Sequence, residues 1–173
     1  MKLTKSVEQA ICILIFLVTQ EKNEPLATDE ISNKLNVSPS YLKKITRKLV
    51  KKKIITSVSG NRGGISLAKS PEEINMLDII EAMEGPISIY SDTGLIETVF
   101  KGGKHTDKGS DILRNVFKQA DLLLIEYFSK ITAADLLKES FGTENIPTLN
   151  WNKMSLTEYV EANCQNLSEN EEK

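Results

Sequence analysis

The chain contains little cysteine and little histidine. Its 173 residues include two cysteines, Cys12 and Cys164, and one histidine, His105. The cysteines lie far apart and form no Cys-x-x-Cys pair, which argues against a disulfide framework or a zinc site and fits a reducing, cytoplasmic location. Cys12 falls in an apolar segment and is expected to be a buried structural thiol, so Cys164, near the end of the chain, is the candidate for oxidation.

Long apolar runs and catalytic motifs are also absent. The longest apolar run, residues 10–18, is about half the length needed to span a bilayer, so no membrane association is expected. The sequence has no Gly-x-Ser-x-Gly elbow, no Gly-x-x-x-x-Gly-Lys phosphate loop and no His-Glu-x-x-His motif. The chain is therefore not expected to be an enzyme, and its motifs imply no cofactor.

Acidic residues are absent from residues 37–64. The whole chain has a formal net charge of −2, but residues 1–70 hold 13 Lys and Arg against 5 Asp and Glu, whereas residues 71–173 hold 9 against 19. The first part therefore carries +8 and the second −10. Such asymmetry predicts an end that binds a polyanion such as double-stranded DNA and an end with another role. Chance clustering on solvated faces is the alternative.

The acid-free stretch begins with a basic helix. Ser38 as the capping residue and Pro39 at the first helical position predict an abrupt helix start. A shorter helix capped by Thr28 precedes it, and Asn36 is the expected left-handed stop between the two. Two short helices joined by a tight turn are typical of a helix-turn-helix. The second carries seven Lys or Arg, and three apolar residues at helical spacing form its buried face: Leu42, Ile45 and Leu49.

A predicted hairpin follows the basic helix. Residues 54–59 and 65–68 are expected to form two strands, and the turn between them is rich in glycine, which permits positive φ. A hairpin in this position would be the wing of a winged helix-turn-helix domain. A fourth helix over about residues 75–83 is expected to complete that domain, which spans residues 1–86.

The second half of the chain predicts a dimerisation region. Residues 87–107 show no firm period and are expected to form a connecting segment. Residues 108–141 are expected to form one long helix, whose apolar stripe is too broad for a lone surface helix. A seam across a homodimer is the natural use of such a stripe, and packing within one chain is the alternative. The tail, residues 142–173, is expected to pack on this region through Trp151. The predicted fold is thus mainly α with a small β wing.

Four segments resemble one known family. They are Met-Lys-Leu-Thr at 1–4, Val-Ser-Pro-Ser-Tyr-Leu at 37–42, Ser-Val-Ser-Gly-Asn-Arg-Gly-Gly at 57–64 and Leu-Asp-Ile-Ile-Glu-Ala-Met-Glu-Gly-Pro at 77–86. In this order and spacing they resemble the Rrf-two family of bacterial winged helix-turn-helix transcription regulators, the IscR, NsrR and CymR type. The resemblance implies a homodimer, crossed through the long helix, that binds a palindromic operator and is expected to act as a repressor.

The resemblance and the basic pattern together give the candidate DNA-binding residues. The family places the start of the third helix in the major groove and the wing beside it. Where the wing of the family usually carries Arg before its first glycine, this chain has Ser59, and Arg62 lies nearer the tip. The candidates are Ser38, Ser40, Tyr41, Lys43, Lys44, Arg47 and Lys48 on the helix, and Ser59, Asn61 and Arg62 on the wing. A solvated lysine-rich face is the alternative.

The family pattern breaks after the fourth helix. Cluster-binding members carry three cysteines there, whereas residues 86–108 of this chain have none, and thiolates are the usual ligands of an iron–sulfur cluster. We therefore expect no cluster. The effector is left open between a small molecule, a protein partner and a thiol switch. A winged-helix module that binds a protein partner or RNA, and no operator, is the alternative function.

Overall fold

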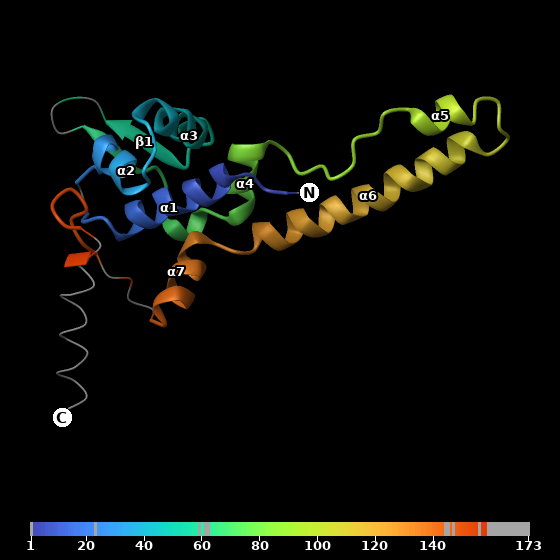
Figure 1. Ribbon diagram of the computed structural model, residues 1–173. Helices are drawn as coiled ribbons and strands as arrows, with labels where there is room; N and C mark the ends of the chain where they lie inside the picture. The colour runs from blue at the N-terminus through green and yellow to red at the C-terminus, as the bar shows by residue number, and fades with distance from the viewer. Residues whose placement is uncertain are drawn as a thin grey trace.

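The computed structural model describes residues 2–22, 24–58, 60, 63–143, 146, 148–155 and 157–158. The described elements form a helical body with a small sheet, from which one long helix extends as an arm (Figure 1). The fold is mainly α with a two-stranded wing, as the sequence predicts. The body contains α1 (Lys5–Thr19), α2 (Thr28–Lys34), α3 (Pro39–Lys51), β1 (Ile55–Val58), β2 (Gly64–Leu67), η1 (Pro71–Glu73), α4 (Met76–Glu84) and α7 (Ala133–Phe141), and the arm contains α5 (Leu95–Val99) and α6 (Thr106–Ser129).

α1 forms the centre of the body. It packs against α3, α4, α7 and β2. Each fully buried aliphatic side chain contributes about 1.5–3 kcal/mol relative to an exposed one, so the inner face of α1 is a main source of the stability that holds α3 and the wing in place. The buried apolar residues of α1 are Val7, Ala10, Ile13, Leu14 and Leu17.

The turn between α2 and α3 has the predicted conformation. Asn36 has a φ of +50°, in the left-handed region that asparagine tolerates better than most residues. The Ser38 hydroxyl accepts a hydrogen bond from the Tyr41 N–H at 3.2 Å, and Pro39 occupies the first turn of α3. Local sequence therefore sets both the end of the turn and the start of α3.

The wing is tied to the body through its second strand. β1 and β2 pair antiparallel, with Val58 opposite Gly64. Leu26, in the loop before α2, exchanges two backbone hydrogen bonds with Ile65, both at 2.9 Å. A Cβ on Gly64 would lie 2.3 Å from the Leu26 carbonyl oxygen, so this close backbone approach requires glycine.

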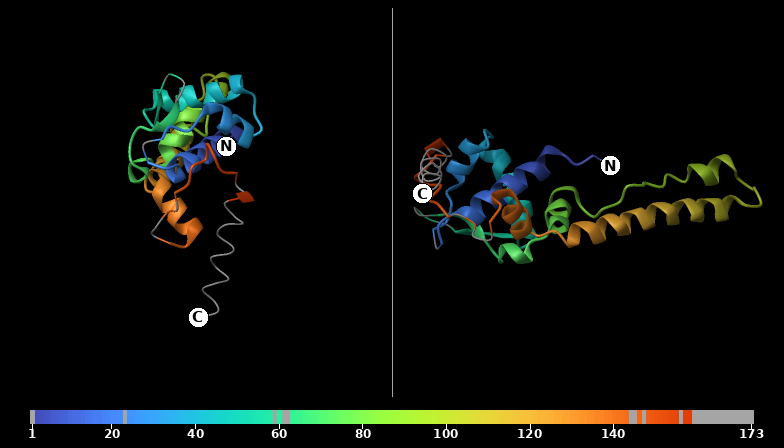
Figure 2. Two further views of the ribbon diagram at one scale, coloured as in Figure 1. Left: turned by 90° about the vertical axis from the view of Figure 1, so that its left-hand side faces the viewer. Right: turned by 90° about the horizontal axis from the view of Figure 1, so that it is seen from below.

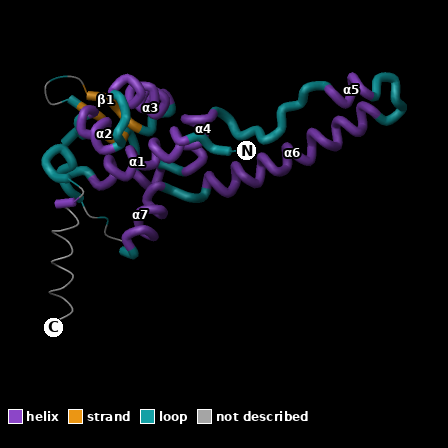
Figure 3. The backbone as a smooth tube through the Cα atoms, in the orientation of Figure 1, coloured by secondary structure: helices purple, strands orange, loops and turns teal. Residues whose placement is uncertain are grey.

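The arm extends away from the body. α6 has 24 residues and is about 36 Å long. The connecting segment, residues 87–105, lies beside α6 in two different views (Figures 1 and 2), and outside the short helix α5 it is loop (Figure 3). Within α6 itself Ser110 is the single buried residue. No helix in the described part of the chain is both long enough and apolar enough to cross a membrane.

The prediction of one helix over residues 108–141 is wrong. The chain leaves helical geometry after α6, and α7 starts afresh with a capping box in which the Thr132 hydroxyl accepts from the Asp135 N–H at 3.1 Å and Asp135 Oδ2 accepts from the Thr132 N–H at 2.9 Å. A tertiary contact fixes the break, because the Met76 N–H donates to the Ile131 carbonyl at 2.9 Å. α7 therefore packs on α1 rather than extending the arm (Figure 1).

The described part of the tail packs on α1 and not on α6, which corrects the prediction for Trp151. The Trp151 indole N–H donates to the Thr19 hydroxyl at 2.8 Å, and the indole ring meets Phe16 edge-on at 5.0 Å. Leu149 extends the contact by pairing its backbone with residues at the end of α1. The described tail residues around Trp151 thus add to the body instead of the dimerisation region.

The same tail segment replaces the predicted cap of α2. Thr28 is the first residue of α2 and not its cap, because Ala27 holds the N-cap position. The Ala27 N–H donates to Asn152 Oδ1 at 3.0 Å. A side chain 125 residues away in sequence therefore satisfies a donor that a local cap usually satisfies.

Candidate nucleic-acid interface

α3 divides its residues between a buried and an exposed face. Leu42, Ile45 and Leu49 are at most 2% exposed, which confirms the predicted buried stripe. Thr46 is buried with them, and its hydroxyl donates to the Leu42 carbonyl at 3.1 Å, a role that the apolar spacing did not reveal. The candidate DNA-binding residues of this region are all exposed: Ser38, Ser40, Tyr41, Lys43, Lys44, Arg47 and Lys48.

Lys43, Lys44 and Arg47 on α3 have no acidic partner among the described residues, and neither have Lys48 and Lys51 of the same helix. The absence of acids from residues 37–64 explains why none lies within reach on the same segment. Unpaired cations gathered on one face attract phosphate and steer a polyanion toward that face.

Two other lysines of this region contact residues of α4. Lys48 Nζ donates to the Met83 carbonyl at 2.6 Å, near the end of α4, where cations are favoured. Lys52 Nζ lies 2.9 Å from Glu81 Oε2. These contacts orient α3 on the body, and the Lys48 ammonium is less available to an outside ligand than its exposure suggests.

The hydroxyl groups at the start of α3 are also engaged. The Tyr41 hydroxyl donates to Gln9 Oε1 of α1 at 3.1 Å, which links the two helices. The Ser38 and Ser40 hydroxyls lie 3.1 Å apart, close enough for a hydrogen bond. Ser38 and Ser40 remain exposed, so both can exchange these weak local bonds for a phosphate oxygen.

A hollow between α3 and the wing brings two further polar residues to the basic face. Thr28, at the start of α2, and Ser57, on β1, line it together with Lys43 and Arg47. Sequence reasoning did not select Thr28 or Ser57 as ligands, since their position beside α3 depends on how α2 and the wing pack. The remaining lining residues are Pro39, Leu42, Thr46, Val50 and Ile65.

Four predicted site residues lie outside the described part of the chain. These are Ser59, Asn61 and Arg62 of the wing turn and Cys164 of the tail. The strands that lead into the wing turn end beside α3, since the hollow described above contains residues of both elements. The predicted roles of these four residues therefore stay predictions.

The connecting segment is fastened to α6 by side chains of the chain itself. Arg114 forms ion pairs with Asp92, Glu97 and Asp111. The pKa of Asp92 is lowered, first by the hydrogen bond from the Gly94 N–H and then by Arg114. The pKa of Glu97 is lowered, first by its own backbone N–H and, to a smaller extent, by Arg114. We call these four charged residues the Arg114 cluster.

Two neutral contacts extend this attachment toward the body. The Tyr90 ring stacks on Phe117 with centroids 4.6 Å apart and planes 12° apart. The Ile89 N–H donates to Asp121 Oδ1 at 2.9 Å. Residues of the connecting segment thus cover one side of α6 and leave another side open.

A helix-turn-helix with a basic second helix and an adjoining two-stranded wing defines a winged helix-turn-helix protein. A family model, Rrf2, described as an iron-dependent transcriptional regulator, matches residues 3–139. The chain belongs to the Rrf2 family, as the four segments of the sequence predict. Its relatives are named as helix-turn-helix transcriptional regulators, so the coarse function is that of a DNA-binding transcription regulator.

Individual relatives agree with this assignment. YwgB of Bacillus subtilis is 36% identical over 124 residues, which cover 66% of this chain and 80% of YwgB. The transcriptional regulator NsrR of Bacillus licheniformis is 30% identical over 139 residues, which cover 79% of this chain and 92% of NsrR.

Two solved structures share the fold. CymR of B. subtilis, titled the global cysteine regulator, superposes with a TM-score of 0.58 at 23% identity, covering 79% of this chain and 95% of CymR. IscR of T. potens superposes with a TM-score of 0.57 at 22% identity, covering 81% of this chain and 88% of IscR. At these identities the likeness is one of fold alone.

The residues present do not fit the iron that the family description names. The described part of the chain contains no group of three or more His, Cys, Asp or Glu side chains placed to hold a metal ion. The carboxylates of Asp92, Glu97 and Asp111 do converge on the arm, but the Arg114 guanidinium is paired with all three. A cation of the protein itself therefore already neutralises this acidic group.

Proposed function

We propose that this chain is a cytoplasmic, homodimeric repressor that binds a palindromic DNA operator and works without an iron–sulfur cluster. The observation that carries the proposal is the set of unpaired cations on α3, Lys43, Lys44 and Arg47, beside the wing. In this proposal residues 1–86 bind DNA, residues 87–107 connect, and the dimerisation region begins at residue 108. The break after α6 limits the part of that region available for pairing to the arm.

The start of α3 would enter the major groove. Lys43 and Lys44 then reach base edges, for which guanine O6 and N7 are the usual lysine acceptors. Ser38 and Ser40 donate to phosphate oxygens alongside the free N–H groups of the helix N-terminus, and Arg47 neutralises a phosphate further along. Lys48 acts by holding α3 against α4 through its hydrogen bond to Met83. Ser59, Asn61 and Arg62 would contact the adjacent backbone or minor groove from the wing.

The open side of α6 supports a homodimer. Four large apolar side chains on α6 are more than half exposed, at spacings of 4, 7 and 4 residues that place them on one stripe. Leaving them in water is costly, and a second copy of the same helix offers the matching surface. The four are Ile112, Val116, Leu123 and Tyr127, with exposed fractions of 56%, 57%, 68% and 62%.

Pairing through the arms sets the form of the operator. A two-fold axis across α6 gives two copies of α3, and two recognition helices about 34 Å apart contact successive major grooves on one side of B-DNA. The operator is then an inverted repeat. The Arg114 cluster holds the connecting segment on α6, and this segment has no cysteines that could bind an iron–sulfur cluster. A small-molecule or protein effector that binds the connecting segment could therefore change the distance between the two copies of α3.

The test is binding to duplex DNA that contains the protein's own promoter, measured by gel shift and by salt titration. Lys43→Glu should weaken binding about 5- to 150-fold, because it removes a base contact and adds repulsion. Lys51→Glu is the matched control, since it makes the same charge change at the far end of α3. Equal weakening by both variants would contradict the groove assignment, and a salt slope near zero for the parent protein would favour the protein- or RNA-binding alternative.

A further inference from the structure

The hollow between α3 and the wing has a volume of about 510 Å³. This volume falls in the range of about 300–1,000 Å³ that is usual for small-molecule sites. Residues of α2, α3 and both strands of the wing line the hollow, and none of these described lining residues is acidic. The hollow therefore combines the size of a ligand site with a positively charged lining.

One stripe of α3 forms a wall of this hollow. Four of the lining residues recur at spacings of 4, 4 and 3, which places them on one helical face: Pro39, Lys43, Arg47 and Val50. Lys43 and Arg47 lie one turn apart without a described acidic partner, so they repel each other until an anion neutralises them. At the two ends, Pro39 is exposed and Val50 is 40% exposed. The wall thus presents positive charge between two exposed apolar surfaces.

The other elements around the hollow add two hydroxyl groups. Thr28 of α2 and Ser57 of β1 are exposed, and no residue that the structure describes forms a hydrogen bond with either hydroxyl. A hydroxyl can donate a hydrogen bond to a carboxylate or phosphate oxygen. Ile65 of β2 contributes a further apolar surface to the same hollow. An anion in the hollow therefore meets hydrogen-bond donors from elements other than α3.

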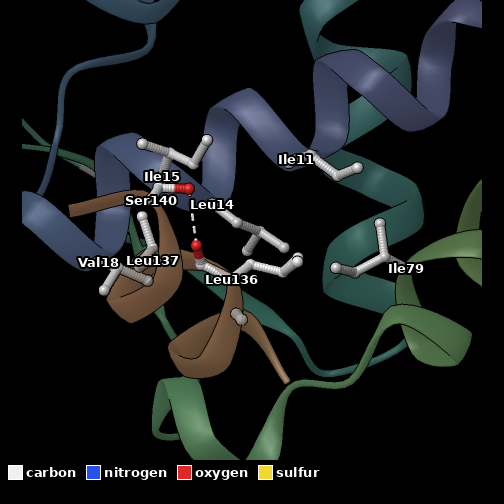
Figure 4. Close-up of a pocket in the computed structure, with 9 residues that line it drawn as sticks. Ile11, Leu14, Ile15, Val18, Ile79, Leu136, Leu137 and Ser140 are labelled. Carbon is white, nitrogen blue, oxygen red and sulfur yellow. Dashed lines mark hydrogen bonds between the residues drawn. The ribbon is translucent and has the colours of Figure 1, made fainter. Parts of the chain in front are cut away.

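A second hollow, between α1 and α7, lacks this combination. Figure 4 shows Leu14 and Val18 of α1 beside Leu136 and Leu137 of α7. None of the described residues that line this second hollow is charged, and the Ser140 hydroxyl there donates to the Leu136 carbonyl at 2.7 Å. An uncharged apolar molecule suits the second hollow, whereas the hollow beside the wing suits a molecule that is both apolar and anionic.

We propose that the hollow between α3 and the wing binds a small organic anion with an apolar body, such as a medium-chain carboxylate, and that the bound anion excludes DNA from α3. The carboxylate accepts hydrogen bonds from Lys43 and Arg47, and the planar guanidinium of Arg47 matches its two oxygens. The apolar body covers Val50 and Pro39, which an inorganic anion would leave in water. The exclusion of DNA rests on the proposed function, because it requires Lys43 and Arg47 to contact DNA. The binding of the anion does not rest on it.

Isothermal titration calorimetry of the full chain without DNA tests the binding step. Octanoate carries both parts of the proposed ligand, acetate carries the charge alone, and octanol carries the apolar chain alone. Octanoate should bind at least about tenfold more tightly than acetate, because it also buries its chain, and at least about tenfold more tightly than octanol, because it also accepts charged hydrogen bonds. Equal binding of octanoate and acetate would reduce the hollow to a basic patch and overturn the proposal. Equal binding of octanoate and octanol would overturn it as well, since the charge would then contribute nothing.

Variants of the full chain locate the site. Arg47→Ala should weaken octanoate binding at least about fivefold, since a hydrogen bond between charged groups is lost. Val50→Ser should weaken the binding of octanoate and leave the binding of acetate unchanged. Lys51→Ala removes a cation of α3 that does not line the hollow, and it should leave octanoate binding unchanged. Unaltered circular dichroism verifies that each variant is folded. Equal weakening by Arg47→Ala and Lys51→Ala would overturn the assignment to this hollow.

Fluorescence anisotropy of a labelled duplex that contains the protein's own promoter tests the exclusion of DNA. At ten times its dissociation constant, octanoate should weaken DNA binding about tenfold, as simple competition requires, and acetate at the same ionic strength should not. An unchanged affinity for the duplex in the presence of octanoate would overturn the exclusion of DNA. A parent protein that binds octanoate in the calorimeter and binds no duplex DNA would instead contradict the proposed function and support the anion site alone.

Discussion

α3 and α6 are both amphipathic helices that pack one face on their own chain, and they differ in what the other face presents. The open face of α3 carries Lys43, Lys44 and Arg47 without acidic neighbours, whereas the open face of α6 carries large apolar side chains such as Leu123. An unpaired cationic face suits a polyanion and an unpaired apolar face suits another apolar face. Because the two faces lie on different parts of the molecule, binding of DNA and pairing of subunits can be disrupted separately.

The largest expected effect, on both oligomeric state and operator affinity, comes from a substitution on the arm. Leu123→Glu should convert the dimer to a monomer and lower operator affinity at least about 100-fold, because two symmetry-related leucines each lose about 1.5–3 kcal/mol of burial. Sedimentation or light scattering measures the first effect and a gel shift the second. Lys118→Glu, on the opposite side of α6, should leave the protein with the molecular mass of a dimer. A Leu123→Glu variant that remains a dimer would remove α6 as the pairing surface.

A smaller effect is expected where the wing meets the body beside α3. Gly64→Ala places a Cβ 2.3 Å from the Leu26 carbonyl oxygen, and overpacking of this kind typically costs about 1–3 kcal/mol. For a chain of this size the melting temperature should fall by about 2–4 °C per kcal/mol, measured by circular dichroism. Gly60→Ala is not a matched control, since Gly60 has a φ of +116°, but Gly109→Ala is, because nothing lies within 4 Å of its Cβ position. Equal melting temperatures for the Gly64 and Gly109 variants would contradict the close approach.

The third change separates two roles of one residue on α3. Tyr41→Phe removes the hydroxyl that donates to Gln9, and a typical hydrogen bond contributes about 0.5–1.5 kcal/mol. We expect the free energy of unfolding, measured in urea, to fall by this amount with little change in DNA affinity, since the hydroxyl bonds to α1. In a double-mutant cycle, Tyr41→Phe should have no further effect in a Gln9→Leu background. A large loss of DNA affinity with unchanged stability would instead assign the hydroxyl to a phosphate.

The smallest effect is expected at the Arg114 cluster, whose groups lie at the surface, with Glu97 partly buried. The folded-state pKa values of Asp92 and Glu97 lie below their ordinary values, so their contribution to stability is present above the ordinary carboxyl range and is lost as pH falls through the lowered values. The protection factors of amides in the connecting segment, which correct exchange rates for their intrinsic pH dependence, should therefore be constant at pH 5–7 and fall below about pH 4. Arg114→Gln should weaken that pH dependence but not abolish it, because the backbone N–H groups of Gly94 and Glu97 still stabilise the two carboxylates, whereas Lys118→Gln should leave it unchanged.

Local chemistry explains what could be predicted from the sequence. The start of α3 depends on Ser38 and Pro39, and the preceding turn depends on Asn36, so neighbours in the chain decide them. The buried stripe of α3 also follows from spacing alone. The predicted strands differ by one residue from the start of β1 and from both ends of β2, because strand ends depend on pairing across the hairpin, and the predicted last residue of the first strand, Ser59, lies outside the described residues.

The errors occur where distant segments meet. The break between α6 and α7 is stabilised by the Met76–Ile131 hydrogen bond, although the Thr132 and Asp135 capping box is visible in the sequence and could have indicated it. Trp151 packs on α1 because Leu149 pairs with the end of that helix, which no periodicity encodes. Thr28 and Ser57 reach the basic face only through the packing of α2 and the wing.

The family, the helix-turn-helix and the basic face of α3 could be predicted from the amino-acid sequence alone, because capping, turn conformation, helical period and charge act over a few residues. Three features follow from the fold instead: α6 ends at Ser129, the connecting segment covers one side of α6 and leaves the other open, and Trp151 lies against α1. These outcomes depend on hydrogen bonds and apolar contacts between segments far apart in the chain. Such contacts depend on how whole surfaces pack against one another, which the residues near each contact in the sequence do not determine.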